Sequence, residues 1–201
     1  MNLIKNLYVI SIYEEVWFSR MLWVAILLLG ASLVSALIDN IGPCDVTVIT
    51  EGNFSLEQFS TENNGIWTYV KVPSTESTEY LESMIYTITP TECYGQYHVI
   101  IYYKNYGDQE YKLFTDEDAF DSTNGHITSI TRGEPRIVLR IYFLKYVPGR
   151  YVYFYICSDG GGEKNVDYRY VMAHGPLSDD DKSDIQCLEE QFQFSGVLKD
   201  I

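Results

Sequence analysis

The sequence predicts an all-β domain of eight antiparallel strands, arranged as a sandwich or a barrel and followed by one C-terminal α-helix. Two observations lead to this prediction. Segments rich in Val, Ile, Thr, Tyr and Phe recur at short, regular spacing, and Pro, Gly or Asn turn signals separate them. After Ser178 the apolar residues change from the spacing of a strand to that of a helix.

Residues 1–36 are predicted to be an N-terminal extension and a secretion signal peptide that is cleaved. An uninterrupted apolar run from Leu22 to Leu29 is followed by small residues that end at Ala36, as at a signal-peptidase site. The alternative is an uncleaved anchor, because the mostly apolar run 21–37 is close to the shortest that spans a bilayer. Residues 1–20 are either a long n-region of the signal peptide or the product of a rarely used upstream start codon, because a complete signal peptide begins at Met21. Cleavage leaves residues 37–201 as a single domain.

The predicted strands are bounded by turn signals. They cover residues 66–72, 80–89, 96–104, 110–115, 126–132, 136–146, 151–157 and 167–173. The sixth segment alternates most clearly, because its odd-numbered residues from Ile137 to Phe143 are apolar and positions 136 and 140 carry arginine. The pattern is typical of a sandwich or an up-and-down barrel.

One helix is predicted over residues 179–194, ending before Gly196. Ser178 is suited to cap its N-terminus, and three aspartates in the first turn favour the positive end of the helix dipole. Ile185, Leu188 and Phe192 share one face and are expected to pack the helix against the outside of the sheet.

The charge of the chain is strongly acidic, which excludes several classes of partner. The 28 Asp and Glu outnumber the 14 Lys and Arg, giving a net charge of −14, and residues 1–36 are themselves neutral. Without a cluster of Lys or Arg, nucleic acid, heparin and anionic membrane surfaces are not expected as partners. The 18 Tyr and 9 Phe are more than a disordered chain carries and indicate a folded domain. No membrane span is expected after the signal peptide is cleaved.

No arrangement of residues predicts an enzyme, a cofactor or a metal site. His98, His126 and His174 are scattered over a strand, a turn edge and a strand exit, and there is no Gly-x-Ser-x-Gly motif. Haem ligation by one histidine, or calcium binding at Asp179–Asp181, explains these residues less simply than surface, core and capping roles. Gly160–Gly162 lacks the Gly-Lys-Ser/Thr ending of a phosphate loop and predicts a hairpin turn.

The cysteines and one sequon are typical of an exported protein. The four cysteines predict two disulfides, and three pairings remain open. Their spacing does not suit zinc, and no Cys-x-x-Cys pair occurs. Asn53-Phe54-Ser55 is a glycosylation sequon, so Asn53 is expected to be exposed and modified.

Four short motifs, in this order, resemble those of the lipocalin family. They are Gly65-Ile66-Trp67, then Val72-Pro73, the run from Tyr153 to Ser158, and the run from Tyr168 to Pro176. The cysteine at the end of the seventh strand is similar to the arthropod and apolipoprotein D branch of the family. The resemblance implies an eight-stranded antiparallel up-and-down barrel, with the C-terminal helix packed outside and Trp67 plugging the closed floor.

Three departures mark a divergent member of that family. His174 stands where the family has an arginine stacked on the floor tryptophan. Residues 146–150 replace the usual Thr-Asp-Tyr turn, and the stretch between Phe54 and Trp67 is longer than usual.

The resemblance also implies the disulfides and the inward faces of the strands. Cys44 would pair with Cys157, which leaves Cys93 and Cys187 as the second pair. If Cys157 points outward, Tyr151, Tyr153 and Tyr155 point outward too, by the period of two. The residues expected to line the interior and contact a ligand are Trp67, Tyr69, Tyr97, Val99, Ile101, Tyr103, Leu139, Ile141, Phe143, Phe154, Tyr168, Tyr170 and Met172.

The function that the resemblance implies is a secreted, extracellular carrier, not an enzyme. It would sequester a small hydrophobic ligand such as a bilin, retinoid, fatty acid or sterol-like molecule. The alternative is a barrel filled by its own side chains, acting on a protein partner or forming a homodimer through its loops or the outer tyrosine row. A third hypothesis is an interior acidic site for a cationic amine at Glu82 or Glu117, although the predicted inward faces are mostly apolar.

Overall fold

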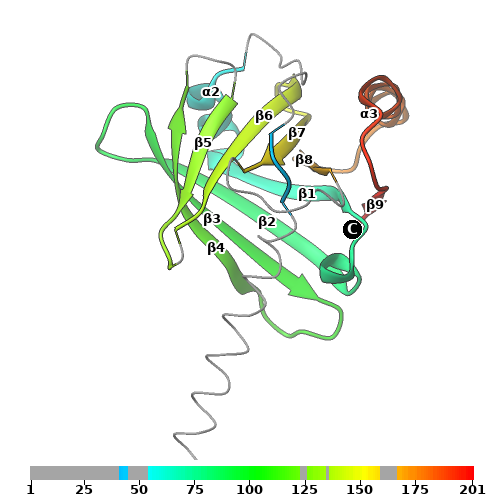
Figure 1. The fold of residues 1–201 in the computed structure, drawn as a ribbon, viewed down its shortest axis with the longest axis horizontal. Helices are drawn as coiled ribbons and strands as arrows, with labels where there is room; N and C mark the ends of the chain where they lie inside the picture. The colour runs from blue at the N-terminus through cyan, green and yellow to red at the C-terminus, as the bar shows by residue number, and fades with distance from the viewer. Residues whose placement is uncertain (1–40, 45–53, 123–125, 135, 159–166) are drawn as a thin grey trace, which may run out of the picture. The chain divides into compact units, whose positions relative to one another are not determined.

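The chain folds into one antiparallel sheet that closes on itself (Figure 1). The computed structural model describes residues 41–44, 54–122, 126–134, 136–158 and 167–201. The predicted signal peptide with its cleavage site, Asn53 and the Gly160–Gly162 turn lie outside these residues. Within the described part of the chain, no helix is both long enough and apolar enough to cross a membrane.

Eight strands form the barrel and a ninth lies beside it. Their bounds are β1 (Ile66–Pro73), β2 (Leu81–Pro90), β3 (Gln96–Asn105), β4 (Lys112–Asp121), β5 (His126–Thr131), β6 (Val138–Val147), β7 (Tyr151–Cys157), β8 (Tyr168–Ala173) and β9 (Leu198–Asp200). The order runs from β2 to β8 and then to β1, which pairs back with β2 and closes the ring. The predicted eight-stranded barrel is therefore confirmed, and the sandwich is excluded.

Strand β1 changes partner part-way along its length. Its first residues pair with β2, from Ile66 opposite Thr87 to Thr68 opposite Ile85. It also pairs with β8 from Thr68 to Lys71, with a register shift between Tyr69 and Lys71, and from Lys71 to Pro73 it pairs with β9. A bulge bends a strand and re-aims it, so β1 joins the barrel at one end and the C-terminal strand β9 at the other. The sequence did not predict β9.

Strand β4 is longer than the predicted segment 110–115. It continues through Asp116, Glu117 and Asp118, which are poor strand formers. Arg132 compensates the two aspartates, with its guanidinium 3.6 Å from Asp116 and 2.7 Å from Asp118. Ion pairs on the outer surface therefore override the local preference of the sequence.

The predicted C-terminal helix is confirmed as α3 (Asp179–Phe192). The Ser178 side chain accepts a hydrogen bond from the Asp181 amide at 3.1 Å, and Asp181 accepts one from the Ser178 amide at 3.0 Å. This capping box fixes the start of the helix. Ile185 is buried against the outside of the barrel, with Leu188 and Phe192 packed around it.

The outer tyrosine row lies under α3 and is not exposed. Tyr151, Tyr153 and Tyr155 point outward as predicted, but each is at most 1% exposed. The expectation that this row offers a surface to a partner or a second copy is wrong, because the helix and the residues after it cover the row. Tyr155 stacks on Phe194, with ring centroids 5.3 Å apart.

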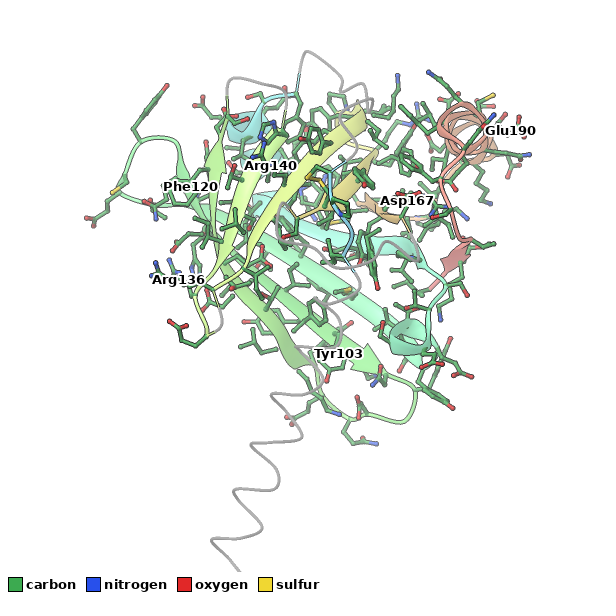
Figure 2. All side chains as sticks on the ribbon, in the orientation of Figure 1. Tyr103, Phe120, Arg136, Arg140, Asp167 and Glu190 are labelled. Carbon is green, nitrogen blue, oxygen red and sulfur yellow. A yellow bond between two sulfur atoms is a disulfide. The ribbon has the colours of Figure 1, made fainter. Side chains whose placement is uncertain are left out.

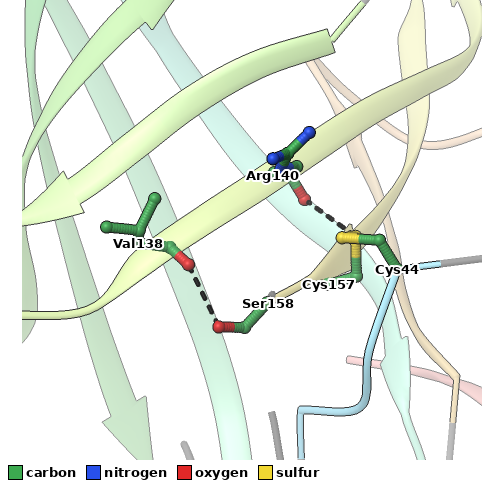
Figure 3. Close-up of a disulfide and its surroundings, with 5 residues drawn as sticks. All are labelled: Cys44, Val138, Arg140, Cys157 and Ser158. Atoms are coloured by element: carbon green, nitrogen blue, oxygen red, sulfur yellow. Dashed lines mark hydrogen bonds between the residues drawn. A yellow bond between two sulfur atoms is a disulfide. The ribbon is translucent and has the colours of Figure 1, made fainter. Parts of the chain in front are cut away.

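One disulfide joins Cys44 to Cys157, as the resemblance implied. Beside it, the Ser158 hydroxyl donates to the Val138 carbonyl at 3.1 Å (Figure 3), and the Ser158 amide donates to the Gly42 carbonyl at 3.1 Å. Together these contacts tie the N-terminal segment to the end of β7.

The predicted Cys93–Cys187 pair is wrong, because both thiols are free and exposed. Cys93 lies in the turn between β2 and β3, whereas Cys187 lies on α3, whose buried residues pack against β7 and β8. A disulfide needs Cα atoms within about 7 Å. The order of strands around the barrel separates these two elements.

Candidate functional site

The barrel interior holds the residues that the strand alternation and the family resemblance together predicted. Eleven of the thirteen belong to one apolar cluster: nine are buried in it, and Tyr103 and Tyr170 are partly buried and pack against it. Leu139 pairs with Ser129 and Tyr168 pairs with Ile156, and paired residues of an antiparallel ladder share a face. The thirteen predicted positions therefore all face inward, while their contact with a ligand stays a prediction.

The closed end of the barrel is built around Trp67. A short helix, α2 (Leu56–Thr61), and the 3₁₀ turn η1 (Glu62–Gly65) precede β1 at this end. The ring of Phe59 stacks on Trp67 with centroids 4.6 Å apart, and Trp67 Nε1 donates to the Phe59 carbonyl at 3.2 Å. Gly65 has a φ of +72°, and a Cβ there would lie 2.0 Å from the Ile88 carbonyl oxygen, so only glycine fits.

His174 closes the other side of this floor. Its ring centroid lies 3.7 Å from that of Trp67, and its Nε2 lies 3.6 Å from Glu62 Oε2. Glu62 also accepts hydrogen bonds from the Tyr146 hydroxyl at 2.6 Å and the Gly149 amide at 2.9 Å. His174, which follows β8, and Glu62 of η1 thus hold the floor tryptophan in place.

The opposite end of the barrel keeps contact with solvent. Tyr103, Phe114, Ile156 and Tyr170 pack against the inner cluster but are only partly buried. Tyr103 lies near the end of β3 (Figure 2), with its ring centroid 6.1 Å from that of Phe114. Inward side chains that remain partly exposed show that solvent reaches the interior from this end.

A carboxyl group lies inside the barrel at Glu117. It pairs with Val99 of β3, which belongs to the inner cluster, and it is 4% exposed. The Ser129 hydroxyl donates a hydrogen bond to it. Burial raises the pKa of Glu117 above its ordinary value, and hydrogen bonds from Ser129 and Thr115 offset this only in part.

Phenol groups surround this carboxyl. Burial raises the pKa of Tyr86, and the nearby charge of Glu117 raises it further. Burial likewise raises the pKa of Tyr69, and the groups of Tyr170, Tyr86 and Glu117 add to that shift. The four groups come from β1, β2, β4 and β8, so the closure of the barrel brings together residues that are far apart in the sequence.

The other ionisable candidates lie elsewhere. Glu82 is partly exposed and pairs with Lys104 at 3.4 Å, so it does not join Glu117 inside. His98 pairs with Asp116 at 2.8 Å on the outer face, and His126 stacks on Tyr142 with centroids 4.9 Å apart. Within the described residues, no three of His, Cys, Asp and Glu gather as a metal site would require.

Comparisons with known proteins identify the architecture through structure alone. No protein-family model matches the sequence, and no curated protein matches it. The tryptamine complex of the amine binding protein of Rhodnius prolixus is similar with a TM-score of 0.58 and 18% identity, over 79% of this chain and 86% of that one. Insecticyanin from the tobacco hornworm Manduca sexta is similar with a TM-score of 0.55 and 15% identity, over 76% and 80%. The chain has the lipocalin fold.

A third solved structure, a mutant of LTBP1 in complex with leukotriene C4, is similar with a TM-score of 0.51 and 14% identity, over 80% of this chain and 94% of that one. At these identities the likeness establishes the fold, and the ligand must be argued from this chain's own residues.

The sequence patterns did not predict part of the barrel interior. Phe54 stacks on Phe143 with centroids 3.4 Å apart, and Leu56 and Phe59 are fully buried. The sequence signal for this helix, α2, is weak: Ser55 as an N-cap, followed by the apolar residues Leu56 and Phe59 at i, i+3 spacing. The residues that β2 contributes to the inner cluster, Leu81, Met84, Tyr86 and Ile88, were not predicted either.

Proposed function

We propose that this protein is a secreted carrier that binds and sequesters a small, mostly hydrophobic molecule inside its barrel. The observation that carries the proposal is the interior itself: an aromatic and aliphatic lining that is sealed at the Trp67 floor and reached by solvent at the other end. An eight-stranded barrel is just wide enough to hold one small ligand. Burying an apolar ligand there would release roughly 25 cal/mol per Å² of apolar surface.

Two neighbours with the same fold support the proposal. One was solved with tryptamine and another with leukotriene C4, and both ligands combine an apolar body with polar groups. The lining of this barrel offers matching surfaces, because phenols of Tyr69, Tyr86 and Tyr170 are interspersed among apolar side chains. Binding of this kind needs no catalytic group.

Secretion is the second part of the proposal. The Cys44–Cys157 disulfide suits an oxidising compartment. The predicted signal peptide and the Asn53 sequon agree with export, and both are tested by expressing the full chain in eukaryotic cells. We expect the medium to contain a glycosylated protein whose N-terminus is Leu37, as measured by intact mass before and after deglycosylation.

Ligand binding is tested on this secreted protein. Native mass spectrometry with an absorption spectrum would reveal a co-purifying ligand, and titration with a fluorescent fatty acid and with N-phenyl-1-naphthylamine would measure binding directly. A protein that carries no small molecule and binds neither probe would overturn the carrier function.

Two neighbouring residues of β6 give a matched pair of variants. Leu139 faces the interior and is partly buried, whereas Val138 is 44% exposed on the other face. Leu139→Trp should fill interior space and weaken probe binding by about tenfold, while Val138→Trp should leave it unchanged. Equal effects of the two variants, with both melting temperatures preserved, would place binding outside the barrel.

A further inference from the structure

We infer that the ligand of the proposed carrier bears a positively charged nitrogen, and that Glu117 is the residue that binds it. This inference rests on the proposed function and specifies its ligand class. It follows from three observations: Glu117 is buried inside the barrel, phenol and hydroxyl groups lie around it, and no described cationic side chain pairs with it.

Glu117 differs from the two acidic residues beside it in the chain. Asp116 and Asp118 point outward, where Arg132 and His98 pair with them. Glu117 points inward, where its hydrogen-bond partners are the hydroxyls of Ser129 and Thr115. No Lys, Arg or His pairs with Glu117 within the described residues. The strand therefore neutralises its outer carboxylates and leaves the inner one without a cation.

A buried carboxyl without a cationic partner is unfavourable for folding. Desolvation disfavours its charged form, and an apolar residue at this position would stabilise the barrel. The raised pKa of Glu117 expresses the same effect, because an empty interior favours the protonated form. A cationic ligand would favour the charged form of Glu117 instead, because it would place a positive charge beside the carboxylate inside the apolar barrel.

The groups around Glu117 favour a cation over an anion. The phenols of Tyr86 and Tyr69 lie close enough to interact electrostatically with the carboxyl. The Tyr69 ring meets that of Tyr170 edge-on at 5.5 Å, and Tyr170 stacks on Phe154 at 5.6 Å. Aromatic faces attract ammonium groups, and buried faces do so most strongly. These side chains can hold the apolar body and the charged end of one small molecule.

The charge of the molecule acts in the same direction. The chain carries a net charge of −14, so its field attracts cations from solution and repels anions. Two described residues on the inward faces could carry a positive charge, and each has its own acidic partner: Lys112, opposite Tyr103 at the open end, pairs with Asp108 at 2.7 Å, and His174, against the Trp67 floor, lies beside Glu62. A fatty-acid carboxylate inside this barrel would meet Glu117 without a counter-charge. The structure thus favours an aromatic or long-chain amine over a fatty acid.

Matched pairs of probes test the inference. Phenethylamine is compared with phenethyl alcohol, and decylamine with decanol, because each pair shares an apolar body and differs in one charged group. Affinities are measured by calorimetry or by displacement of N-phenyl-1-naphthylamine at about pH 7.5, where the amines are protonated. We expect the wild-type protein to bind at least one amine about tenfold more tightly than its alcohol.

Three variants assign the preference to Glu117. Glu117→Gln should abolish the preference while still binding the alcohols, and Glu117→Asp should keep part of it. Asp116→Asn removes the same charge from the outer face of the same strand and should leave the preference intact. Thermal unfolding of each variant shows that it is folded.

The outcomes separate this inference from the proposed function. If the wild-type protein binds alcohols and amines equally, or Glu117→Gln keeps the preference, the assignment of Glu117 is wrong and the carrier function stands. If no probe and no co-purified molecule binds, the carrier function fails and the inference fails with it. Lowering the pH should also reduce the amine preference, because burial raises the pKa of Glu117 and protonation removes the charge that the amine would meet.

Discussion

The barrel buries charged groups in two regions, and the two regions treat them differently. Under α3, Arg169 is 1% exposed and uses all five of its N–H groups. It donates to both oxygens of Glu189 at 2.6 and 2.5 Å and to the carbonyls of Asp167, Ser195 and Gly196, each at 3.0 Å. Inside the barrel, Glu117 is almost as deeply buried but has only hydroxyl partners.

Arg169 therefore carries a structural charge, whereas the charge of Glu117 is available for binding a ligand. Burial alone would lower the pKa of Arg169, but the hydrogen bonds and charge of Glu189 raise it above its ordinary value. The guanidinium thus joins β8 to α3 and to the residues that lead into β9. Glu117 joins no second element by a charged contact, so the closed fold leaves its charge for another molecule to neutralise.

Removing the structural charge should have the largest effect. Arg169→Ala leaves Glu189 and three carbonyls without their donor, and we expect a loss of about 3–5 kcal/mol of unfolding free energy. Urea denaturation measures the loss, and limited proteolysis should show that α3 is released first. Lys182→Ala, on the exposed face of the same helix, is the control and should change stability by less than about 0.5 kcal/mol.

Removing the interior charge of Glu117 should instead increase the free energy of unfolding. Glu117→Gln should stabilise the protein without ligand by about 1 kcal/mol at neutral pH, because an uncompensated buried carboxylate is lost. Since folding raises the pKa of Glu117, its contribution to stability is greatest below its ordinary pKa and is lost as the pH rises through the raised value. The difference between variant and wild type should therefore grow as the pH rises, and parallel curves of melting temperature against pH would contradict it.

A single hydroxyl of the outer network gives a smaller test. The Tyr153 hydroxyl donates to Glu189 beneath α3, so Tyr153→Phe should cost about 1 kcal/mol. Tyr94→Phe is the control, because Tyr94 is fully exposed in the turn between β2 and β3. Chemical denaturation of both variants distinguishes a network contribution from a general effect of removing a phenol.

The smallest effect concerns the proton on Glu117. The hydrogen bond from Ser129 lowers the pKa of Glu117 and so offsets part of the effect of burial. Ser129→Ala should move the carboxyl titration to higher pH, as followed by carbon-detected NMR of labelled glutamate. Thr128→Ala changes the adjacent outward residue of β5 and should leave the titration where it is.

Much of this fold follows from local sequence patterns. Strand β7 has the predicted bounds of 151–157, and the alternation in β6 separated its inward residues correctly, while in β7 and β8 the family resemblance was needed to choose the inward face. The reason is that a barrel interior is apolar on one face of each strand, so a period of two is present in the sequence itself. The Ser178 capping box is equally local, which is why the start of α3 was predicted correctly.

The parts that were missed depend on contacts between distant residues. β9 is a strand only because β1 offers it an edge, and α2 is stable because Phe59 packs on Trp67. The outer tyrosines could not be distinguished from an exposed row, since their period is the same whether or not a helix covers them. The free state of Cys93 and Cys187 likewise follows from where the barrel places them.

The sequence by itself determined the existence of the eight barrel strands, their two-residue alternation, the helix and its cap, because each depends on residues within a few positions of one another. Only the tertiary structure decided what each buried charge does. Glu117, Asp116 and Asp118 are neighbours in the chain with the same chemistry, yet one faces an interior without a cation and two face Arg132 across the outer surface. Closure of the barrel sets that difference, because it determines which residues from other strands stand opposite each side chain.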